Sequence, residues 1–260
     1  MNPDCLKIRE NILKISNASG HGHIPTCFSI VELLTGVYSI IKHNPRDPTM
    51  GDRDYFFLSK GHAALGHYCV LSHFGYFPIE HVYSFGAFES DFGCHADRNK
   101  VPGIEASTGS LGHGIGIAVG TALGLQLKDS AQTVFCIIGD GEANEGTVWE
   151  SVMVAVNLKL NNLTVIYDNN QSHSRGLQIR NPLKIFEAFG CEAIEVDGHD
   201  VTKINDVLSK KQTGFRAVVA NTKKGFGCPS LVSGHHEWHR RSPNKEELKS
   251  LLEELHAQAV

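Results

Sequence analysis

The chain has 260 residues, 41% of them hydrophobic, and a formal net charge of -4 at neutral pH. That length can bury a substantial core and stands near the upper limit of one domain, so we expect a single α/β domain over residues 1–260. Nucleic acid and anionic membranes attract a concentrated basic surface, which this slightly acidic chain lacks. We therefore expect no nucleic-acid partner and no membrane partner.

The cysteines and the N-terminus predict a cytoplasmic, soluble protein. The seven cysteines are scattered, odd in number and never spaced as Cys-x-x-Cys, which is typical of reduced thiols in the cytosol. The first ten residues contain Asp4, Lys7, Arg9 and Glu10 where a secretory signal would be apolar. No segment approaches the eighteen or so apolar residues that a membrane-spanning helix needs.

The first half of the chain predicts helices separated by loops. Apolar spacing indicates an opening helix over residues 6–15, and Ser29 with Glu32 predicts a capping box that begins a second helix ending at Ile41. A loop over 44–54, a short strand over 55–58 and a helix over 63–74 follow. Residues 89–110 are rich in Gly, Asp and Ser and predict a long surface loop, a feature that is usually functional or disordered.

The second half alternates buried strands with helices. Strands are predicted at 133–138, 163–167, 192–196 and 217–220, with a helix over 145–160 between the first two. Short apolar strands separated by helices predict a mostly parallel sheet covered on both faces, which is a three-layer αβα fold of the α/β class. Ser242-Pro243 predicts the start of a last helix with one stripe of leucines.

A glycine stripe marks the predicted helix after Ser110. Gly112, Gly116, Gly120 and Gly124 recur every four residues and therefore share one face. Two explanations stay open: close packing inside the domain, or contact with a second subunit. A membrane helix is excluded because the apolar window ends at Lys128.

The strongest chemical signal lies at two successive strand ends. The strand over 134–138 runs into Gly139-Asp140-Gly141, and the next strand ends at Asn169-Asn170, thirty residues after Asp140. Ligands of open parallel sheets bind at the carboxyl ends of strands, and one βαβ unit has about that length. The glycines admit a bulky anion, while Asp and Asn oxygens suit a hard cation. Either motif alone is more often a turn, but together they predict a metal-diphosphate site.

The segment from Gly139 to Asn170 resembles the thiamine diphosphate motif, which begins Gly-Asp-Gly and closes on an Asn one βαβ unit later. Three other segments resemble the N-terminal half of transketolases: Ser-Gly-His at 19–21, Leu-Ser-Lys-Gly-His at 58–62, and residues 103–114. Their order and spacing agree with that family over residues 5–240. The resemblance implies the diphosphate-binding fold of thiamine diphosphate enzymes.

The resemblance also implies which residues hold the cofactor and its metal. Asp140 and Asn170 would bind Mg²⁺, or Ca²⁺ or Mn²⁺, through their side chains, and Ser172 through its backbone carbonyl. The matching positions imply that the residues in contact with thiamine diphosphate are His62, Gly109, Ser110, Leu111, Gly139, Asp140, Gly141, Glu142, Asn170, Ser172 and His239.

The catalytic residues implied by the resemblance are mostly histidines. His21, His62 and His95 match histidines of the family's active site, where imidazole can move protons to and from sugar oxygens near neutral pH. His95 departs from the pattern, because Ala-Asp follows it where the family has Pro-Glu. Glu145 matches the glutamate that links two active sites across the subunit interface.

A further active-site histidine is expected near the end of the chain. His239 aligns best with it, and His236 is the alternative. The two lie three residues apart, but no distant ligand motif accompanies them, so a zinc site is not favoured.

The resemblance covers only the first domain of a transketolase. The domain that binds the aminopyrimidine and supplies its activating glutamate, and a third domain, would be on a partner chain, most simply in an α2β2 assembly. This implies the N-terminal subunit of a split transketolase, which transfers a two-carbon ketol unit from a ketose or ketose phosphate to an aldose. The glycine-striped helix lies near the subunit interface in transketolases, which implies a dimer contact there.

Two alternative functions stay open. One is a deoxyxylulose phosphate synthase-like or 2-oxo acid-decarboxylating subunit, and the other is a non-catalytic scaffold or regulatory subunit. The substrate also stays open, because Gln171 and Ser172 replace the residues that commonly follow the metal-binding Asn. The donor and acceptor sugars, and whether they are phosphorylated, do not follow from the sequence.

Overall fold

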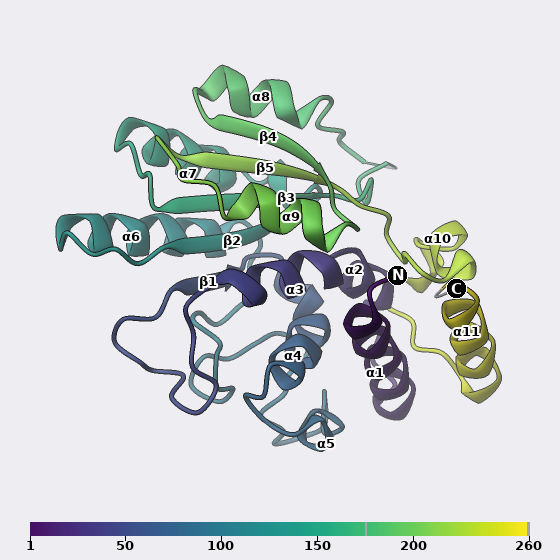
Figure 1. The fold of residues 1–260 in the computed structure, drawn as a ribbon. Helices are drawn as coiled ribbons and strands as arrows, with labels where there is room; N and C mark the ends of the chain where they lie inside the picture. Colours follow the sequence, from purple (N-terminus) through teal and green to yellow (C-terminus); the bar gives the residue numbers. More distant parts are fainter. Residues whose placement is uncertain (175, 259–260) are drawn as a thin grey trace.

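The computed structural model describes residues 1–174 and 176–258, in which helices cover both faces of a five-stranded parallel sheet (Figure 1). The strands are β1 Tyr55–Leu58, β2 Val134–Gly139, β3 Leu163–Asn169, β4 Glu192–Asp197 and β5 Arg216–Asn221. Their order in the sheet is β1-β2-β3-β5-β4, and every neighbouring pair is parallel. The predicted parallel sheet is confirmed.

The helices of the described residues fall into two groups, one on each face of the sheet. Their bounds are α1 Pro3–Ser19, α2 Ile24–Ser29, α3 Val31–Ile40, α4 Ala64–His73, α5 Ile79–Val82, α6 His113–Leu127, α7 Gly146–Asn157, α8 Pro182–Phe189, α9 Val201–Leu208, α10 Pro229–Ser233 and α11 Lys245–Ala257. Short 3₁₀ segments add Gly61–Ala63, Glu142–Asn144 and Glu237–His239.

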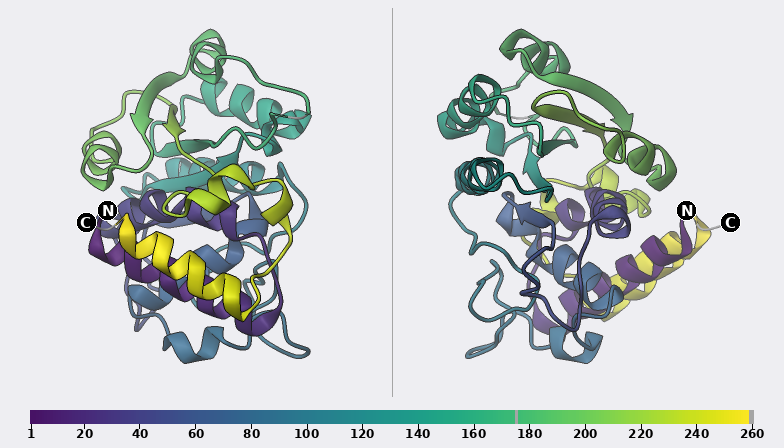
Figure 2. Two further views of the ribbon diagram at one scale, coloured as in Figure 1. Left: turned by 90° about the vertical axis from the view of Figure 1, so that its right-hand side faces the viewer. Right: turned by 60° about the vertical axis from the view of Figure 1, so that its left-hand side comes forward.

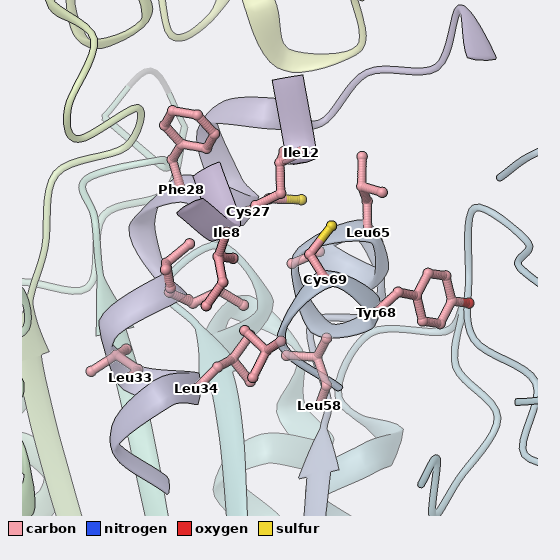
Figure 3. Close-up of a cluster of buried hydrophobic side chains, with 14 of the residues drawn as sticks. Ile8, Ile12, Cys27, Phe28, Leu33, Leu34, Leu58, Leu65, Tyr68 and Cys69 are labelled. Atoms are coloured by element: carbon pink, nitrogen blue, oxygen red, sulfur yellow. The ribbon is translucent and has the colours of Figure 1, made fainter. Parts of the chain in front are cut away.

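Each face of the sheet has its own apolar core because alternate strand residues point to opposite sides. Phe56 and Leu58 of β1 pack toward α1, α3, α4 and α9, whereas Phe57 packs toward α6, α7 and α8. Figure 3 shows the first core, where side chains from α1, α2, α3 and α4 meet at the end of β1. This arrangement confirms the expected three-layer αβα fold.

The two ends of the described chain lie together. Helix α11 packs on α1, and Figure 2 shows the two helices side by side. None of the helices within the described residues is long and apolar enough to cross a membrane. All seven cysteines are free thiols.

Two predicted helix starts are wrong. Ser29 does not cap a helix, because it ends α2 and its hydroxyl donates to the carbonyl of Thr26 and the carboxylate of Asp168. Helix α11 begins at Lys245 rather than at Ser242, since Asn244 forms a complete capping box with Glu247. At the start of α3, the Ser29 hydroxyl is already bound to a distant carboxylate. At the start of α11, the Asn244 capping box sets the first residue of the helix.

The predicted loop over 89–110 contains neither helix nor strand. It is tied to itself by two hydrogen bonds between Ala96 and Thr108, one of them 2.9 Å between backbone atoms. Ala96 is buried in the core. The loop is thereby held where His95 and Gly109 reach the cavity described next.

Candidate active site

Two strand ends meet at the centre of the site. Asp140 follows β2 and Asn170 follows β3, which lie next to each other in the sheet. The backbone N–H of Ser172 donates to Oδ2 of Asp140 at 2.8 Å and to Oδ1 of Asn170 at 2.9 Å. The two strand ends therefore lie side by side, as the spacing of the motif predicted, and both side-chain oxygens accept from the same backbone N–H.

Beneath them lies a fully buried carboxylate that the sequence analysis did not single out, Asp168. Its Oδ2 lies 2.8 Å from Oγ of Ser29, 2.5 Å from Nζ of Lys60 and 2.7 Å from Nδ2 of Asn170, and Thr222 donates to its other oxygen. Because the Asn170 amide nitrogen is bound to Asp168, its amide oxygen faces Asp140. The buried pair of Lys60 and Asp168 thus fixes the orientation of a predicted metal ligand.

The donor set fits a hard divalent cation. Burial raises the pKa of Asp140, and the nearby charge of Asp168 raises it further, against the opposing effect of His173 and Lys60. A raised carboxyl pKa means that negative charge is under-compensated here, which a cation would offset. Carboxylate, amide and backbone oxygens are the ligands that Mg²⁺ prefers.

His173 adds a second group beside the predicted metal ligand. Its Nδ1 lies 2.8 Å from Oδ2 of Asp140, although the angle is not that of a hydrogen bond. Within residues 1–174 and 176–258, no three His, Cys, Asp or Glu side chains are arranged to hold a metal ion. A metal in this site would therefore need amide or backbone oxygens beside Asp140.

Glu142 ties two glycine-rich segments together. Its buried carboxylate accepts hydrogen bonds from Oγ of Ser59 at 2.5 Å and from the backbone N–H groups of Gly112 at 2.8 Å and Gly139 at 3.0 Å. Burial raises its pKa. The carboxylate therefore positions the loop before α6 against the end of β2.

These elements enclose a cavity of about 390 Å³. Eleven of the predicted site residues line it: His62, His95, Gly109, Leu111, Gly139, Asp140, Gly141, Glu142, Asn170, Ser172 and His239. Four further residues that the sequence analysis did not assign to the site also line it: His23, Thr26, Lys60 and Arg240. The structure thus brings together most of the residues chosen from sequence motifs.

Three imidazoles cluster on one wall of the cavity. The ring centroids of His23 and His239 are 5.2 Å apart, those of His23 and His62 5.7 Å, and those of His62 and His239 6.3 Å. Burial, aided by nearby cationic groups, lowers the pKa of His23 and of His239 to about 4 and that of His62 well below its usual value. Near neutral pH these rings are uncharged and can both donate and accept hydrogen bonds.

Lys224 joins this wall to the strand ends. Its Nζ donates to Oγ of Ser172 at 3.0 Å and lies 3.3 Å from Nδ1 of His239. Burial, together with the charge of Lys60, lowers its pKa to about 8. No motif in the sequence marks Lys224, although it follows the end of β5, the strand that pairs with β3.

Three predicted residues do not line the cavity. His21 is half-buried, with its ring edge-on to Phe85 at 5.9 Å and in tight contact with Gly86. Ser110 and Glu145 are exposed, and Glu145 stands directly before α7. Their predicted roles stay predictions.

The structure separates the two candidate histidines near the end of the chain. His239 lines the cavity, whereas His236 lies outside it, with its Nε2 3.4 Å from Oγ of Ser174. Trp238, between them, is buried in the core. Because Trp238 is held in the core, the next side chain, His239, can face the cavity.

Comparison with known proteins gives a consistent result. The family model for the thiamine diphosphate binding domain of transketolase matches residues 7–258. One of the subunits of the apulose-4-phosphate transketolase of Actinobacillus succinogenes is 37% identical over 257 residues, which are 95% of this chain and 93% of that protein. The 6-deoxy-6-sulfo-D-fructose transketolase subunit SqwG of a Clostridium species is 35% identical with the same coverage.

Solved structures agree in fold. The crystal structure of transketolase from Campylobacter jejuni superposes with a TM-score of 0.85 at 28% identity. The match covers 98% of this chain but 43% of the Campylobacter chain, so this chain spans less than half the length of that enzyme.

Proposed function

This chain belongs to the transketolase family, and from that premise we propose that it is the thiamine diphosphate-binding subunit of a two-subunit transketolase. The reaction is transfer of a two-carbon ketol unit from a ketose donor to an aldose acceptor. The observation that carries the proposal is the convergence of the Asp140 and Asn170 oxygens beside a wall of neutral histidines. The near-complete match to single subunits of two other transketolases supports it.

The residues of the strand ends fit the cofactor and its metal. Asp140, Asn170 and the carbonyl of Ser172 would hold Mg²⁺, or Ca²⁺ or Mn²⁺, and through it the diphosphate. His62 and Gly141 would contact the diphosphate directly, and a Cβ on Gly141 would meet no atom within 4 Å, which leaves room for an anion. Bound there, thiamine diphosphate supplies the nucleophilic carbon for cleavage of the ketose.

The chain's own histidines would manage protons during that cleavage. His62, His95 and His239 line the cavity, and neutral imidazole can accept a proton from a sugar hydroxyl and return it later. The lowered pKa of His62 and His239 supports this, since a protonated ring could not accept. His21, against Phe85, would act from the rim of the site rather than from its wall.

The partner would be a second subunit that binds the aminopyrimidine and supplies its activating glutamate, most simply in an α2β2 assembly. Exposed Glu145, before α7, fits the proposed role of a glutamate that links active sites across the interface. The glycine stripe supports contact in the same region. Among the described residues, a Cβ on Gly120 or Gly124 would meet no atom within 4 Å, so neither glycine is needed for packing inside the chain.

The relatives favour ketol transfer over the alternatives. Both relatives are subunits of enzymes named as transketolases. The Actinobacillus enzyme is named for a phosphorylated ketose and the Clostridium enzyme for a sulfonated ketose. We propose the same substrate class here, a ketose that carries an anionic group. A decarboxylating enzyme would instead release carbon dioxide from a 2-oxo acid, and a scaffold would bind no cofactor.

The experiment is reconstitution. The chain is co-purified with the product of a neighbouring gene and assayed for ketol transfer with thiamine diphosphate and Mg²⁺. We expect transfer by the mixture and little by either chain alone, because half of the cofactor site would lie on the partner. Equal rates for the isolated chain and the mixture would contradict the two-subunit proposal.

Asp140→Ala tests the metal-diphosphate site directly. The ion loses its charged ligand and the diphosphate its bridge, so we expect Mg²⁺-dependent affinity for thiamine diphosphate to fall by about tenfold or more, which is about 1.4 kcal/mol. Titration calorimetry of the complex, with and without Mg²⁺, measures this. Asp206→Ala, an exposed aspartate on α9, is the matched control. Unchanged Mg²⁺-dependent affinity of the Asp140 variant would show that the site is misplaced.

A further inference from the structure

Arg240 is a cavity-lining arginine without a carboxylate partner in the described part of the chain. Its neighbour Arg241 shows the contrast. The Arg241 guanidinium pairs with Glu237 at 3.4 Å and with Glu247, and it lies 4.0 Å over the ring of Trp238. Arg241 is thus used within the fold, whereas the exposed Arg240 guanidinium is free for a ligand.

A continuous row of contacts shows where Arg240 stands in the cavity. The row starts at Asp140, whose carboxylate is bound by the N–H of Ser172, and passes from Oγ of Ser172 to Lys224 at 3.0 Å. It continues from Lys224 to Nδ1 of His239 at 3.3 Å, and Arg240 follows His239 in the chain. Arg240 therefore stands next to His239 in the lining of the cavity.

His23 stands beside it. The backbone of His23 is left-handed, with φ of 67°, and its ring lies edge-on to that of His239. The preceding Gly22 is pressed against the Arg240 backbone so closely that a Cβ there would collide with the Arg240 carbonyl. This contact holds the His23 and Arg240 segments in a fixed relation.

The charged groups beside Arg240 and His239 are cationic, and the carboxylates of the cavity lie elsewhere in its lining. The acidic lining residues are Asp140 and Glu142, both at the strand ends. Since His23 and His239 are neutral near pH 7, the formal charges beside them are the guanidinium of Arg240 and the ammonium of Lys224, which lies 3.3 Å from His239. A guanidinium beside imidazole N–H donors is a binding group for an oxyanion, because its planar fork matches phosphate and sulfonate oxygens.

We infer that Arg240, assisted by His23, binds the phosphate or sulfonate group of the donor ketose and makes this chain a determinant of substrate specificity. The inference rests on the proposed function. The diphosphate of the cofactor is the other anion that the cavity would take, and the proposed metal ligands, His62 and Gly141 would serve it. Arg240 remains for the sugar.

The test compares donors in the complex of this chain with its partner subunit. Wild type, Arg240→Gln and Arg240→Lys are assayed with fructose 6-phosphate, with 6-deoxy-6-sulfofructose and with the neutral ketose erythrulose. For Arg240→Gln we expect the ratio of kcat/KM for the anionic donor over that for erythrulose to fall about 10- to 100-fold, mainly through KM, as a lost charge-assisted hydrogen bond predicts. Arg240→Lys keeps the charge and recovers part of the ratio.

Arg241→Gln is the matched control and leaves the ratio unchanged. An unchanged ratio in Arg240→Gln overturns the inference. If the ratio is unchanged and thiamine diphosphate binding measured by calorimetry is weaker, Arg240 serves the cofactor instead of the sugar.

A binding arm separates this inference from the proposed function. If the wild-type complex transfers no ketol unit from any of the three donors, the proposed function fails. Calorimetric titration of the thiamine diphosphate-loaded complex with inorganic phosphate still tests Arg240. Weaker phosphate binding by Arg240→Gln than by Arg241→Gln supports the oxyanion site, and equal affinity overturns it.

Discussion

At the scale of single residues, the site depends on Asp168, a carboxylate that is not proposed to contact the metal or the cofactor. Asp168 is fully buried and holds Lys60, Ser29 and the amide of Asn170 around one oxygen. A buried charge is tolerated only when it is paired and hydrogen-bonded. Its function is therefore to position Asn170.

Lys60→Met should show the cost of breaking this pair. Asp168 would be left buried without its cation, which destabilises a protein by about 3–5 kcal/mol. The free energy of unfolding in urea measures the loss, with the exposed Lys7→Met as control. A Lys60 variant as stable as the Lys7 variant would mean that the other hydrogen bonds to Asp168 suffice.

His67 gives the fold a predictable sensitivity to acid. The ring is buried, its Nε2 lies 2.8 Å from the Tyr38 hydroxyl, and burial lowers its pKa to about 3. An unfolded histidine has a pKa of about 6.5, so below that pH the unfolded chain binds the extra proton and the fold loses stability until about pH 3. From pH 7 to pH 5 this one group removes about 2 kcal/mol.

His67→Gln should reduce that loss, since glutamine can still accept from Tyr38 but does not titrate. We expect the free energy of unfolding of the variant to fall less steeply from pH 7 to pH 5 than that of wild type. Urea unfolding at three or four pH values measures both slopes. Parallel curves would show that His67 carries a proton in the folded protein.

At the scale of elements, a buried ion pair joins α1 to α3. The Arg9 guanidinium binds both carboxylate oxygens of Glu32, at 2.5 and 2.7 Å. His199, in the loop after β4, lies with its Nδ1 3.0 Å from the same carboxylate. Burial alone would raise the pKa of Glu32, but Arg9 and His199 lower it to about 2. The pair's contribution to stability is present above about pH 4.5 and is lost as pH falls toward 2.

Arg9→Met alone should destabilise the chain by about 3–5 kcal/mol, because Glu32 would stay buried without its guanidinium partner. The double variant Arg9→Met/Glu32→Leu should recover much of the loss, since no buried charge then remains. Urea unfolding at pH 7 compares the two. A double variant less stable than the single one would show that His199 needs the carboxylate.

The sequence predicted the elements better than their ends. Strands and the loop over 89–110 follow from local composition, but Ser29 resembles a helix cap while its hydroxyl binds Asp168, 139 residues away. The proximity of the Asp140 and Asn170 oxygens was predictable because both residues follow strands joined by one crossover. The positions of Lys224 and Arg240 were not predictable. Lys224 meets the lining residues Ser172 and His239 through the pairing of β5 with β3, and Arg240 lines the cavity beside Gly22, which no local pattern encodes.

At the scale of the whole molecule, α6 and α7 present an apolar surface on one side of the sheet. Ile117 on α6 and Met153 and Val154 on α7 are 45%, 50% and 46% exposed, and Gly120 on α6 is exposed as well. The two helices pack on each other, so these exposed residues lie on neighbouring helices. An exposed apolar face with a bare glycine stripe fits the close approach of another subunit's helix.

Gly120→Arg should therefore weaken assembly without harming the fold. A Cβ at Gly120 meets no atom within 4 Å in this chain, and arginine favours a helix more than glycine does, so the melting temperature should hold or rise. At the interface the long charged side chain would keep the facing helix away. Gly51→Arg, also with no atom within 4 Å of its Cβ but in the loop before β1, is the matched control. Sedimentation velocity of each variant mixed with the partner subunit should show smaller assemblies for Gly120→Arg alone, and identical profiles would place the interface on another face of the chain.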